Sequence, residues 1–221
     1  MVGGKFQELS VGAESVRLYV CGDDVASRHV VVFHPWWGLN DDVIAYADRL
    51  GAAGFSVLAP DLVRGHTAST VAEAERLAES RDEAHADAVA LAAIDRIAPP
   101  AGPIRIGAVG FSMGAAWAIW CAAKRTAVAA SVVYYGTLQG ASVTRATAPV
   151  LGHFAETDPY ESDEAVLAFE RTLLEAGRRA VIRRYPGTGH WFAEPSRDAW
   201  RPEAAELAFG RTVEFLRELL G

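Results

Sequence analysis

Short apolar runs alternate with longer amphipathic stretches along most of the chain. The runs are rich in β-branched residues, and the longer stretches repeat apolar residues every three or four positions, as the buried face of a helix does. This alternation predicts an α/β fold with a mostly parallel, doubly wound sheet that carries helices on both faces. We expect about seven or eight strands, including those at 16–20, 29–33, 55–59, 104–109, 129–135, 149–155 and 180–185.

The amphipathic stretches predict the helices that cover this sheet. A long Ala-, Glu- and Arg-rich stretch at 69–97 indicates a helix that is broken near Ser80. Asp41 or Asp42 is a suitable cap for an earlier helix. The pattern shows no linker, so we expect a single domain over residues 1–221. Further helices are expected at 115–123, 163–176 and 203–220.

Residues 106–123 carry no charged side chain and approach the length of a membrane-spanning helix. Glycines and a serine interrupt the segment, and Arg105 and Lys124 border it. We interpret it as a strand, a tight turn and a core helix, and we expect no association with a membrane.

The composition is typical of a soluble globular enzyme. Of the 221 residues, 51% are hydrophobic and 22% are charged, and the formal net charge is −7. This apolar content excludes a disordered chain. The negative charge, with no stripe of Lys and Arg, argues against a nucleic-acid partner. We expect a monomer that acts on a small molecule.

The two cysteines, Cys21 and Cys121, lie far apart in the chain. Their placement is typical neither of a disulfide framework nor of a metal site, which favours a reducing compartment. Residues 1–16 lack the apolar core of a signal peptide. We therefore expect a cytoplasmic protein that needs no metal or other cofactor.

The segment Gly110-Phe111-Ser112-Met113-Gly114 carries the candidate chemistry. A predicted strand precedes it and a predicted helix follows, which is the context of a nucleophile elbow. Small residues two places before and after the serine let so tight a turn form without a clash. The turn exposes the Ser112 hydroxyl and leaves the Met113 N–H at a helix N-terminus, where it can stabilise an oxyanion. The alternative is a glycine-rich turn with an inert serine.

A serine becomes a nucleophile when a base takes its proton, and an acid must orient that base. Of the six histidines, His190 is the candidate base, because it lies in a loop after the last predicted strand. We interpret His34 as a residue that holds its loop by a hydrogen bond and His153 as a core residue. His66 is a candidate for lining the pocket.

Two carboxylates follow the strand predicted at 149–155. Asp158 is the preferred acid, because an Asp-Pro step starts a turn that directs the side chain toward the His190 loop. Glu156 remains the alternative, with a solvated surface position as its other interpretation.

Several further segments accompany these residues. They are 30–40 (VVVFHPWWGLN), 54–62 (GFSVLAPDL), Tyr134-Tyr135-Gly136 and 189–192 (GHWF). Together with the elbow and Asp158, they resemble the dienelactone hydrolase family of α/β-hydrolases over nearly the whole chain. The resemblance implies the α/β-hydrolase fold. The connection at 136–148 is short, so we expect no lid domain there.

The resemblance also implies the roles of individual residues. Ser112 is similar to the nucleophile of the family, His190 to its base and Asp158 to its acid. The backbone N–H of Trp36 would join that of Met113 as the oxyanion hole.

Three positions depart from the family pattern. Ser112 replaces a cysteine nucleophile, and Pro35 replaces a glutamate that poises the resting thiol. Glu194, four residues after His190, replaces an arginine that binds a substrate carboxylate. We expect Glu194 to bind at the substrate pocket and to repel acidic substrates; alternatively, it faces solvent and pairs with Arg197.

These features predict a carboxylic-ester hydrolase that cleaves a small ester or lactone through an acyl-enzyme. Trp37 and Trp191, with Trp36, are candidates for an aromatic pocket wall, and a core role is their alternative. Arg76 or Arg81 is a candidate for part of an anion site. A thioesterase or small peptidase would use the same triad, and a binding protein without turnover is the alternative of a different class.

Overall fold

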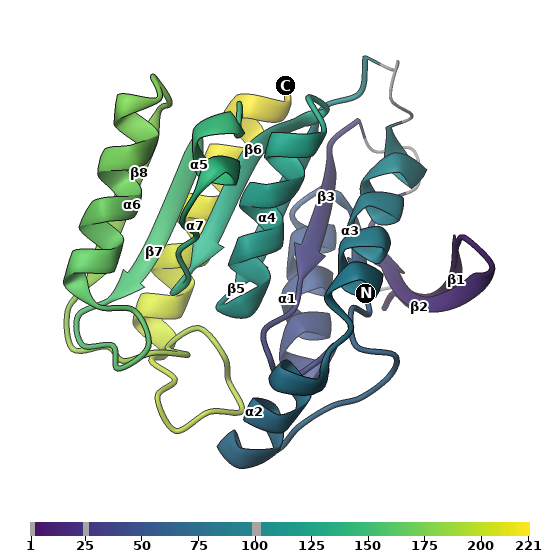
Figure 1. Cartoon of the computed structure of the whole chain (residues 1–221), viewed down its shortest axis with the longest axis horizontal. Helices are drawn as coiled ribbons and strands as arrows, with labels where there is room; N and C mark the ends of the chain where they lie inside the picture. Colours follow the sequence, from purple (N-terminus) through teal and green to yellow (C-terminus); the bar gives the residue numbers. More distant parts are fainter. Residues whose placement is uncertain (1–2, 24–26, 99–102) are drawn as a thin grey trace.

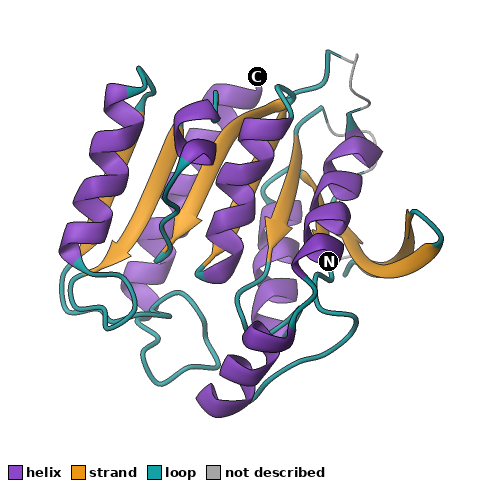
Figure 2. Cartoon of the chain, viewed as in Figure 1, coloured by secondary structure: helices purple, strands orange, loops and turns teal. Residues whose placement is uncertain are grey.

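The computed structural model describes residues 3–23, 27–98 and 103–221, and it contains an eight-stranded sheet with helices on both faces (Figures 1 and 2). The strands are β1 Lys5–Val11, β2 Glu14–Cys21, β3 His29–Phe33, β4 Ser56–Pro60, β5 Ile106–Phe111, β6 Val128–Tyr134, β7 Val150–Ala155 and β8 Ala180–Tyr185. The helices are α1 Asp41–Ala52, α2 Val71–Ser80, α3 Glu83–Ile97, α4 Met113–Lys124, α5 Ala141–Arg145, α6 Asp163–Glu175 and α7 Pro202–Leu220.

The sheet has the strand order β1-β2-β4-β3-β5-β6-β7-β8. β2 is antiparallel to both of its neighbours, and all the other strand pairs are parallel. The predicted α/β-hydrolase fold with a mostly parallel sheet is therefore confirmed. Because parallel strands end at one edge of a sheet, the loops after β3, β5, β6, β7 and β8 gather there (Figure 1).

Two layers of helices enclose the sheet. α1 and α7 pack on one face, and α3, α4 and α6 pack on the other (Figure 1). Every residue of β5 is buried, as are the last four of β3. This double cover explains why the central strands are continuous apolar runs in the sequence rather than alternating ones.

Two elements were not predicted from the sequence. β1 is an edge strand that pairs with β2, and Leu9 is its one fully buried side chain, so its hydrophobic pattern is weak. α5 lies in the connection between β6 and β7 and has five residues, too few for a helical period to show. That connection holds no inserted lid domain, as we predicted.

The ends of several elements differ from the predictions, and two of these differences have a clear cause. Asn40, rather than Asp41 or Asp42, caps α1, and its side chain accepts the Val43 N–H at 3.2 Å. β5 starts at Ile106 rather than at residue 104, because its pairing with β3 begins there. The break near Ser80 is confirmed, since α2 ends at that residue.

The uncharged segment 106–123 forms β5, the turn at Ser112 and most of α4. This outcome confirms the interpretation as strand, turn and helix. Over the described ranges, we find no helix with the length and apolar character that a membrane span requires.

Candidate active site

Ser112 lies in the turn between β5 and α4 with a φ of 48° and a ψ of −116°. A non-glycine residue seldom adopts a positive φ, so the surroundings must hold it there. The Ser112 N–H donates to the Tyr134 carbonyl at 2.8 Å, and the Ser112 carbonyl accepts from the Ala115 N–H at 2.9 Å. The turn is therefore anchored to the neighbouring strand on one side and to the helix on the other.

Glycines make room for this turn. A Cβ on Gly110 would lie 2.2 Å from the Gly114 carbonyl oxygen, and a Cβ on Gly136 would lie 2.4 Å from the Ser112 carbonyl oxygen. Both separations are far inside van der Waals contact. The close packing of the backbone around Ser112 therefore explains the predicted need for small residues beside it.

The structure brings Ser112, His190 and Asp158 together at the carboxyl edge of the sheet. The Ser112 Oγ lies 3.0 Å from His190 Nε2, and His190 Nδ1 lies 2.7 Å from Asp158 Oδ2. A carboxylate accepts from the Nδ1–H, which leaves Nε2 as the acceptor for the serine hydroxyl. The side chains of His190 and Asp158 are 3% and 2% exposed, so bulk water screens their interaction little.

Asp158 also orders its own loop. Its Oδ1 accepts the backbone N–H groups of Tyr160 and Glu161 at 2.9 and 3.1 Å, while Oδ2 is left for the histidine. The alternative acid, Glu156, is exposed and accepts the Gly187 N–H at 2.8 Å instead. The structure thus places Asp158, and not Glu156, against His190.

The sequence predicts that the backbone N–H groups of Met113 and Trp36 form an oxyanion hole. Met113 is the first residue of α4, where N–H groups have no acceptor within the helix. Trp36 lies in a turn after β3, and among the described residues its N–H has no hydrogen-bond acceptor. Both N–H groups are therefore available to an oxyanion at this edge of the sheet.

His34 holds the loop that carries Trp36. Its Nε2 accepts the Leu62 N–H at 3.0 Å, and its Nδ1 lies 2.7 Å from the Pro35 carbonyl, to which it donates. Complete burial lowers the pKa of His34, so the ring stays neutral and can donate from one nitrogen while it accepts at the other. The predicted structural role of His34 is confirmed.

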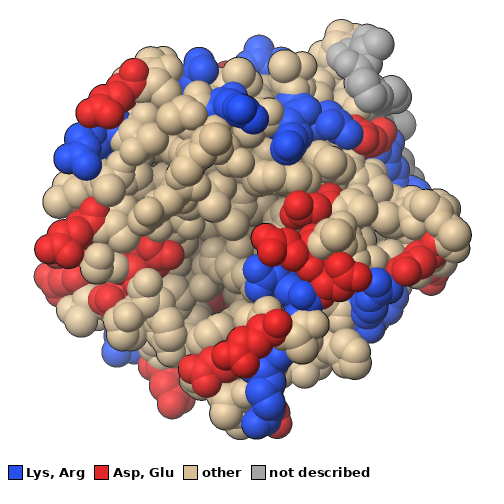
Figure 3. All heavy atoms as spheres, viewed as in Figure 1, with Lys and Arg blue, Asp and Glu red and all other residues tan. Residues whose placement is uncertain are grey.

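A cleft of about 270 Å³ opens beside Ser112 and His190. The surface is hollowed on this face near the N-terminal end of α4 (Figure 3). The other lining residues are Arg81, Glu83, Asp87, Met113, Ala116, Trp117, Trp120, Thr137, Leu138, Ser142, Tyr160 and Glu161. A cleft of this size suits a small substrate.

The apolar wall of the cleft comes largely from α4. Met113, Ala116, Trp117 and Trp120 lie three or four residues apart, so they share one side of the helix. The Trp117 Nε1–H donates to Asp87 at 2.9 Å, which fixes that indole. Sequence reasoning missed both tryptophans, although this spacing after the elbow was a signal that could have found them.

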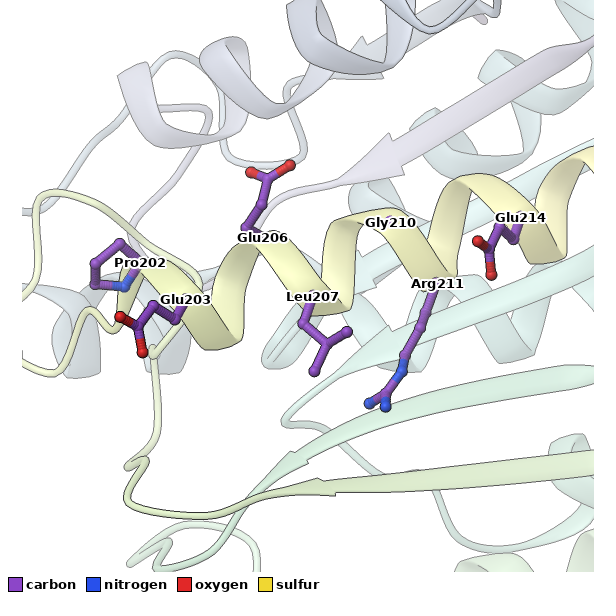
Figure 4. Close-up of a pocket in the computed structure, with 7 residues that line it drawn as sticks. All are labelled: Pro202, Glu203, Glu206, Leu207, Gly210, Arg211 and Glu214. Atoms are coloured by element: carbon purple, nitrogen blue, oxygen red, sulfur yellow. The ribbon is translucent and has the colours of Figure 1, made fainter.

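A larger open depression of about 750 Å³ lies along α7. Leu207 and Arg211 extend from the helix toward the same side of it (Figure 4). Its lining residues, from Pro202 to Glu214, include no Ser, Cys or His. It therefore offers no hydroxyl, thiol or imidazole, whereas the cleft at Ser112 holds both a serine and a histidine.

Comparison of the chain with known protein families gives a match over nearly its whole length. The model of the Dienelactone hydrolase family matches residues 16–220. The chain belongs to the dienelactone hydrolase family. As a member of that family, it is a carboxylic-ester hydrolase.

Three similar proteins illustrate the range of dienelactone hydrolase relatives. A protein of Aquifex aeolicus named as a carboxymethylenebutenolidase is 27% identical, over 98% of this chain and 99% of its own. A Bradyrhizobium protein named as a 2-oxo-3-(5-oxofuran-2-ylidene)propanoate lactonase is 28% identical, over 95% and 92%. The solved structure of a dienelactone hydrolase-like promiscuous phosphotriesterase from metagenomic libraries has a TM-score of 0.85 at 24% identity and covers 99% of this chain and 98% of its own.

In this dienelactone hydrolase family member, the expectation that Glu194 lies at the substrate pocket is wrong. The side chain is 2% exposed, is absent from the cleft lining, and accepts the Tyr135 hydroxyl at 2.8 Å. The solvent-exposed alternative is also wrong. The turn at 191–194 directs Glu194 inward, because the Glu194 N–H donates to the Trp191 carbonyl at 2.9 Å.

Trp37 and Trp191 do not line the cleft either. Their rings pack edge to face at 5.3 Å, and Trp37 is 1% exposed beneath the Arg197 guanidinium, which lies 3.8 Å from its ring. Trp37 thus packs against Trp191, a residue of the His190 loop, and neither ring forms a wall of the cleft. Tyr160, which the sequence analysis did not select, lines the cleft and lies 4.9 Å from the His190 ring.

The remaining candidate residues from the sequence differ in whether they line the cleft. Arg81 lines the cleft, whereas Arg76 and His66 are exposed and do not. His153 is a core residue, as predicted, and burial lowers its pKa to about 3. Within the described residues, no group of three or more His, Cys, Asp or Glu side chains is placed to hold a metal ion.

Proposed function

We propose that the protein is a serine hydrolase that cleaves a small, uncharged ester or lactone through an acyl-enzyme. The observation that carries the proposal is the hydrogen-bonded chain from Ser112 through His190 to Asp158 at the cleft. Family membership supports the hydrolysis of an ester or lactone, and the geometry supports the serine as its nucleophile.

In the first half of the reaction, the Ser112 Oγ attacks the substrate carbonyl carbon while His190 Nε2 accepts the hydroxyl proton. Asp158 stabilises the imidazolium that forms. The carbonyl oxygen becomes an oxyanion between the N–H groups of Trp36 and Met113. The C–O bond to the alcohol then breaks, and the imidazolium returns the proton to the leaving alkoxide.

In the second half, water replaces the alcohol. His190 Nε2 removes a proton from water, the hydroxide attacks the ester carbon of acyl-Ser112, and the same two N–H groups stabilise the second oxyanion. The Ser112 oxygen leaves with the proton from His190, which restores the free enzyme. A lactone gives one hydroxy acid, because its alcohol and acid remain joined.

The cleft favours an uncharged substrate. Its walls hold three carboxylates, from Glu83, Asp87 and Glu161, and one guanidinium, from Arg81. Burial raises the pKa of Glu161, yet Thr137 donates two hydrogen bonds to its carboxylate. A substrate with a free carboxylate would therefore meet more negative than positive charge.

Steady-state turnover of an activated neutral ester, a lactone and a thioester by the purified protein tests the proposal. Ser112→Ala should lower the kcat for the preferred substrate by roughly a thousandfold or more. Ser142→Ala is the matched control, since Ser142 lines the same cleft and has no role in the mechanism. A fluorophosphonate should add to Ser112 with loss of fluoride, which intact mass and peptide mapping detect. If Ser112→Ala kept the wild-type rate at an unchanged melting temperature, the serine mechanism would be wrong.

A further inference from the structure

A buried phenol packs against the His190 loop and is hydrogen-bonded to a buried carboxyl of that loop, and the reaction as described uses neither. The Tyr135 hydroxyl donates to Glu194 Oε1 at 2.8 Å, and the two residues are 0% and 2% exposed. We propose that this pair positions His190: it fixes the loop 189–194 so that the imidazole keeps its distance to Ser112. This inference rests on the proposed serine mechanism.

Tyr135 contacts the loop at three points. Its ring centroid lies 4.9 Å from that of His190 and 5.5 Å from that of Phe192, and its hydroxyl reaches Glu194. The loop itself is tightly turned, because the Phe192 N–H donates to the Gly189 carbonyl at 3.2 Å. A single side chain thus supports both ends of the turn that presents the base.

Tyr135 is also joined to the nucleophile. It follows β6 with a φ of 36°, and its N–H donates to the His153 carbonyl at 2.7 Å. The residue before it, Tyr134, accepts the Ser112 N–H at 2.8 Å, and the residue after it, Gly136, packs against the Ser112 carbonyl. One short segment therefore contacts the backbone of the nucleophile and the ring of the base.

The pair depends on the protonation state of the Glu194 carboxyl. Glu194 Oε2 is buried without a hydrogen-bond partner among the described residues. The pKa of Glu194 is raised to about 8, chiefly by burial. The Asp42 carboxylate on α1 also raises it, while the Tyr135 hydroxyl on the β6 side and Arg197 on its own turn lower it. At neutral pH the group is a neutral acid. An ionised Glu194 carboxylate would be a buried charge with a single hydrogen-bond donor in the described part of the chain, the Tyr135 hydroxyl. Because such a charge is costly to bury, ionisation favours opening of the turn toward water.

Three variants test the proposal. Tyr135→Phe removes the hydroxyl and keeps the ring, and Glu194→Gln keeps an acceptor of the same size that never ionises. Tyr46→Phe is the matched control, because the Tyr46 hydroxyl lies 3.1 Å from that of Tyr134 and is also buried. The Tyr46 ring packs against the rings of Phe111, Tyr134 and Phe209, which lie outside the His190 loop. Each variant is assayed for kcat, KM and melting temperature on a neutral activated ester from pH 6 to 10.

Tyr135→Phe should lower kcat by roughly tenfold or more with little change in KM, because the loss is in the alignment of the base. Tyr46→Phe should lose stability to a similar degree but keep kcat. Glu194→Gln should retain most of the activity at pH 7. A serine triad alone gives a rate that rises as the imidazole loses its proton and then stays level. The wild-type rate should instead fall about tenfold per pH unit above pH 8, and Glu194→Gln should remove that fall.

Two results would overturn the inference. One is a Tyr135→Phe enzyme with wild-type kcat per folded molecule, which would make the pair a purely structural contact. The other is an alkaline fall in rate that Glu194→Gln leaves unchanged, and this readout stands even if Tyr135→Phe does not fold. Failure of the proposed function is separable, since it would appear as turnover by the wild-type protein that Ser112→Ala does not diminish, or as no turnover at all.

Discussion

A Cβ on Gly114 would lie 2.3 Å from the carbonyl oxygen of Phe33. The N-terminal turn of α4 thus packs directly on the end of β3, backbone against backbone, at the point where the Trp36 loop begins. The first turn of α4, which carries the Met113 N–H, therefore lies against the start of the loop that carries the Trp36 N–H.

Gly114→Ala should lower the free energy of unfolding by roughly 1–3 kcal/mol or more, since the Cβ meets backbone that cannot move away. Gly210→Ala is the matched control: Gly210 lies in α7, and a Cβ there meets nothing within 4 Å. That change should raise the free energy of unfolding by roughly 0.5–1 kcal/mol through helix propensity. Urea denaturation measures both, and equal effects of the two substitutions would contradict the crowding at Gly114.

Asp158→Asn should lower kcat by roughly three to four orders of magnitude while the protein stays folded. An amide can donate to Nδ1 and so favour the wrong imidazole tautomer, and it provides no charge for the imidazolium. Glu156→Gln, in the same loop, should change kcat by less than about twofold, since Glu156 is exposed. Parallel kinetics on one neutral ester compare them. A larger loss in Glu156→Gln would reverse the assignment of the acid.

Glu194→Gln should change how stability depends on pH. The pKa of Glu194 is raised from its usual 4.5 to about 8 in the folded protein. Between these values the folded state holds a proton that the unfolded state has lost, so the stability of the wild-type protein falls as pH rises from about 4.5 to about 8. Glu194→Gln removes this loss. Its free energy of unfolding, relative to that of the wild-type protein, should therefore rise from about pH 4.5 to about pH 8 and stay level above pH 8.

The expected advantage of Glu194→Gln above pH 8 is of the order of a few kcal/mol, because one pKa unit corresponds to about 1.4 kcal/mol. Denaturant midpoints at several pH values, compared with those of the exposed control Glu156→Gln, measure it. A constant difference between pH 5 and 9 would show that Glu194 does not titrate in this window.

The wild-type enzyme should turn over a neutral ester with a higher kcat/KM than a matched ester with a free carboxylate. The reason is the three carboxylates of the cleft, and not Glu194 as the sequence suggested. Arg81→Met removes the one cation among the lining residues and should widen the gap, mainly through the KM of the acidic ester. Arg76→Met, on the exposed surface, is the control. A clear wild-type preference for the acidic ester would contradict this account.

The sequence alone determined the parts of the protein that depend on local physics. Apolar runs between amphipathic stretches are enough to predict a parallel sheet covered on both sides, because each pattern reports which faces of an element are buried. The elbow at Ser112 was equally readable, since the need for small neighbours is set within a few residues. The position of His190 followed from chain order, which places the loop after the last strand at the carboxyl edge.

Only the tertiary structure decided which side chains face the cleft. Trp117 and Trp120 line it while Trp37 is buried beneath Arg197, although all three are tryptophans close to predicted site residues. Glu194 turns inward to Tyr135, a residue 59 positions away in the sequence. These outcomes depend on packing between loops that are distant in the chain, and no local pattern encodes the direction in which such loops point their side chains.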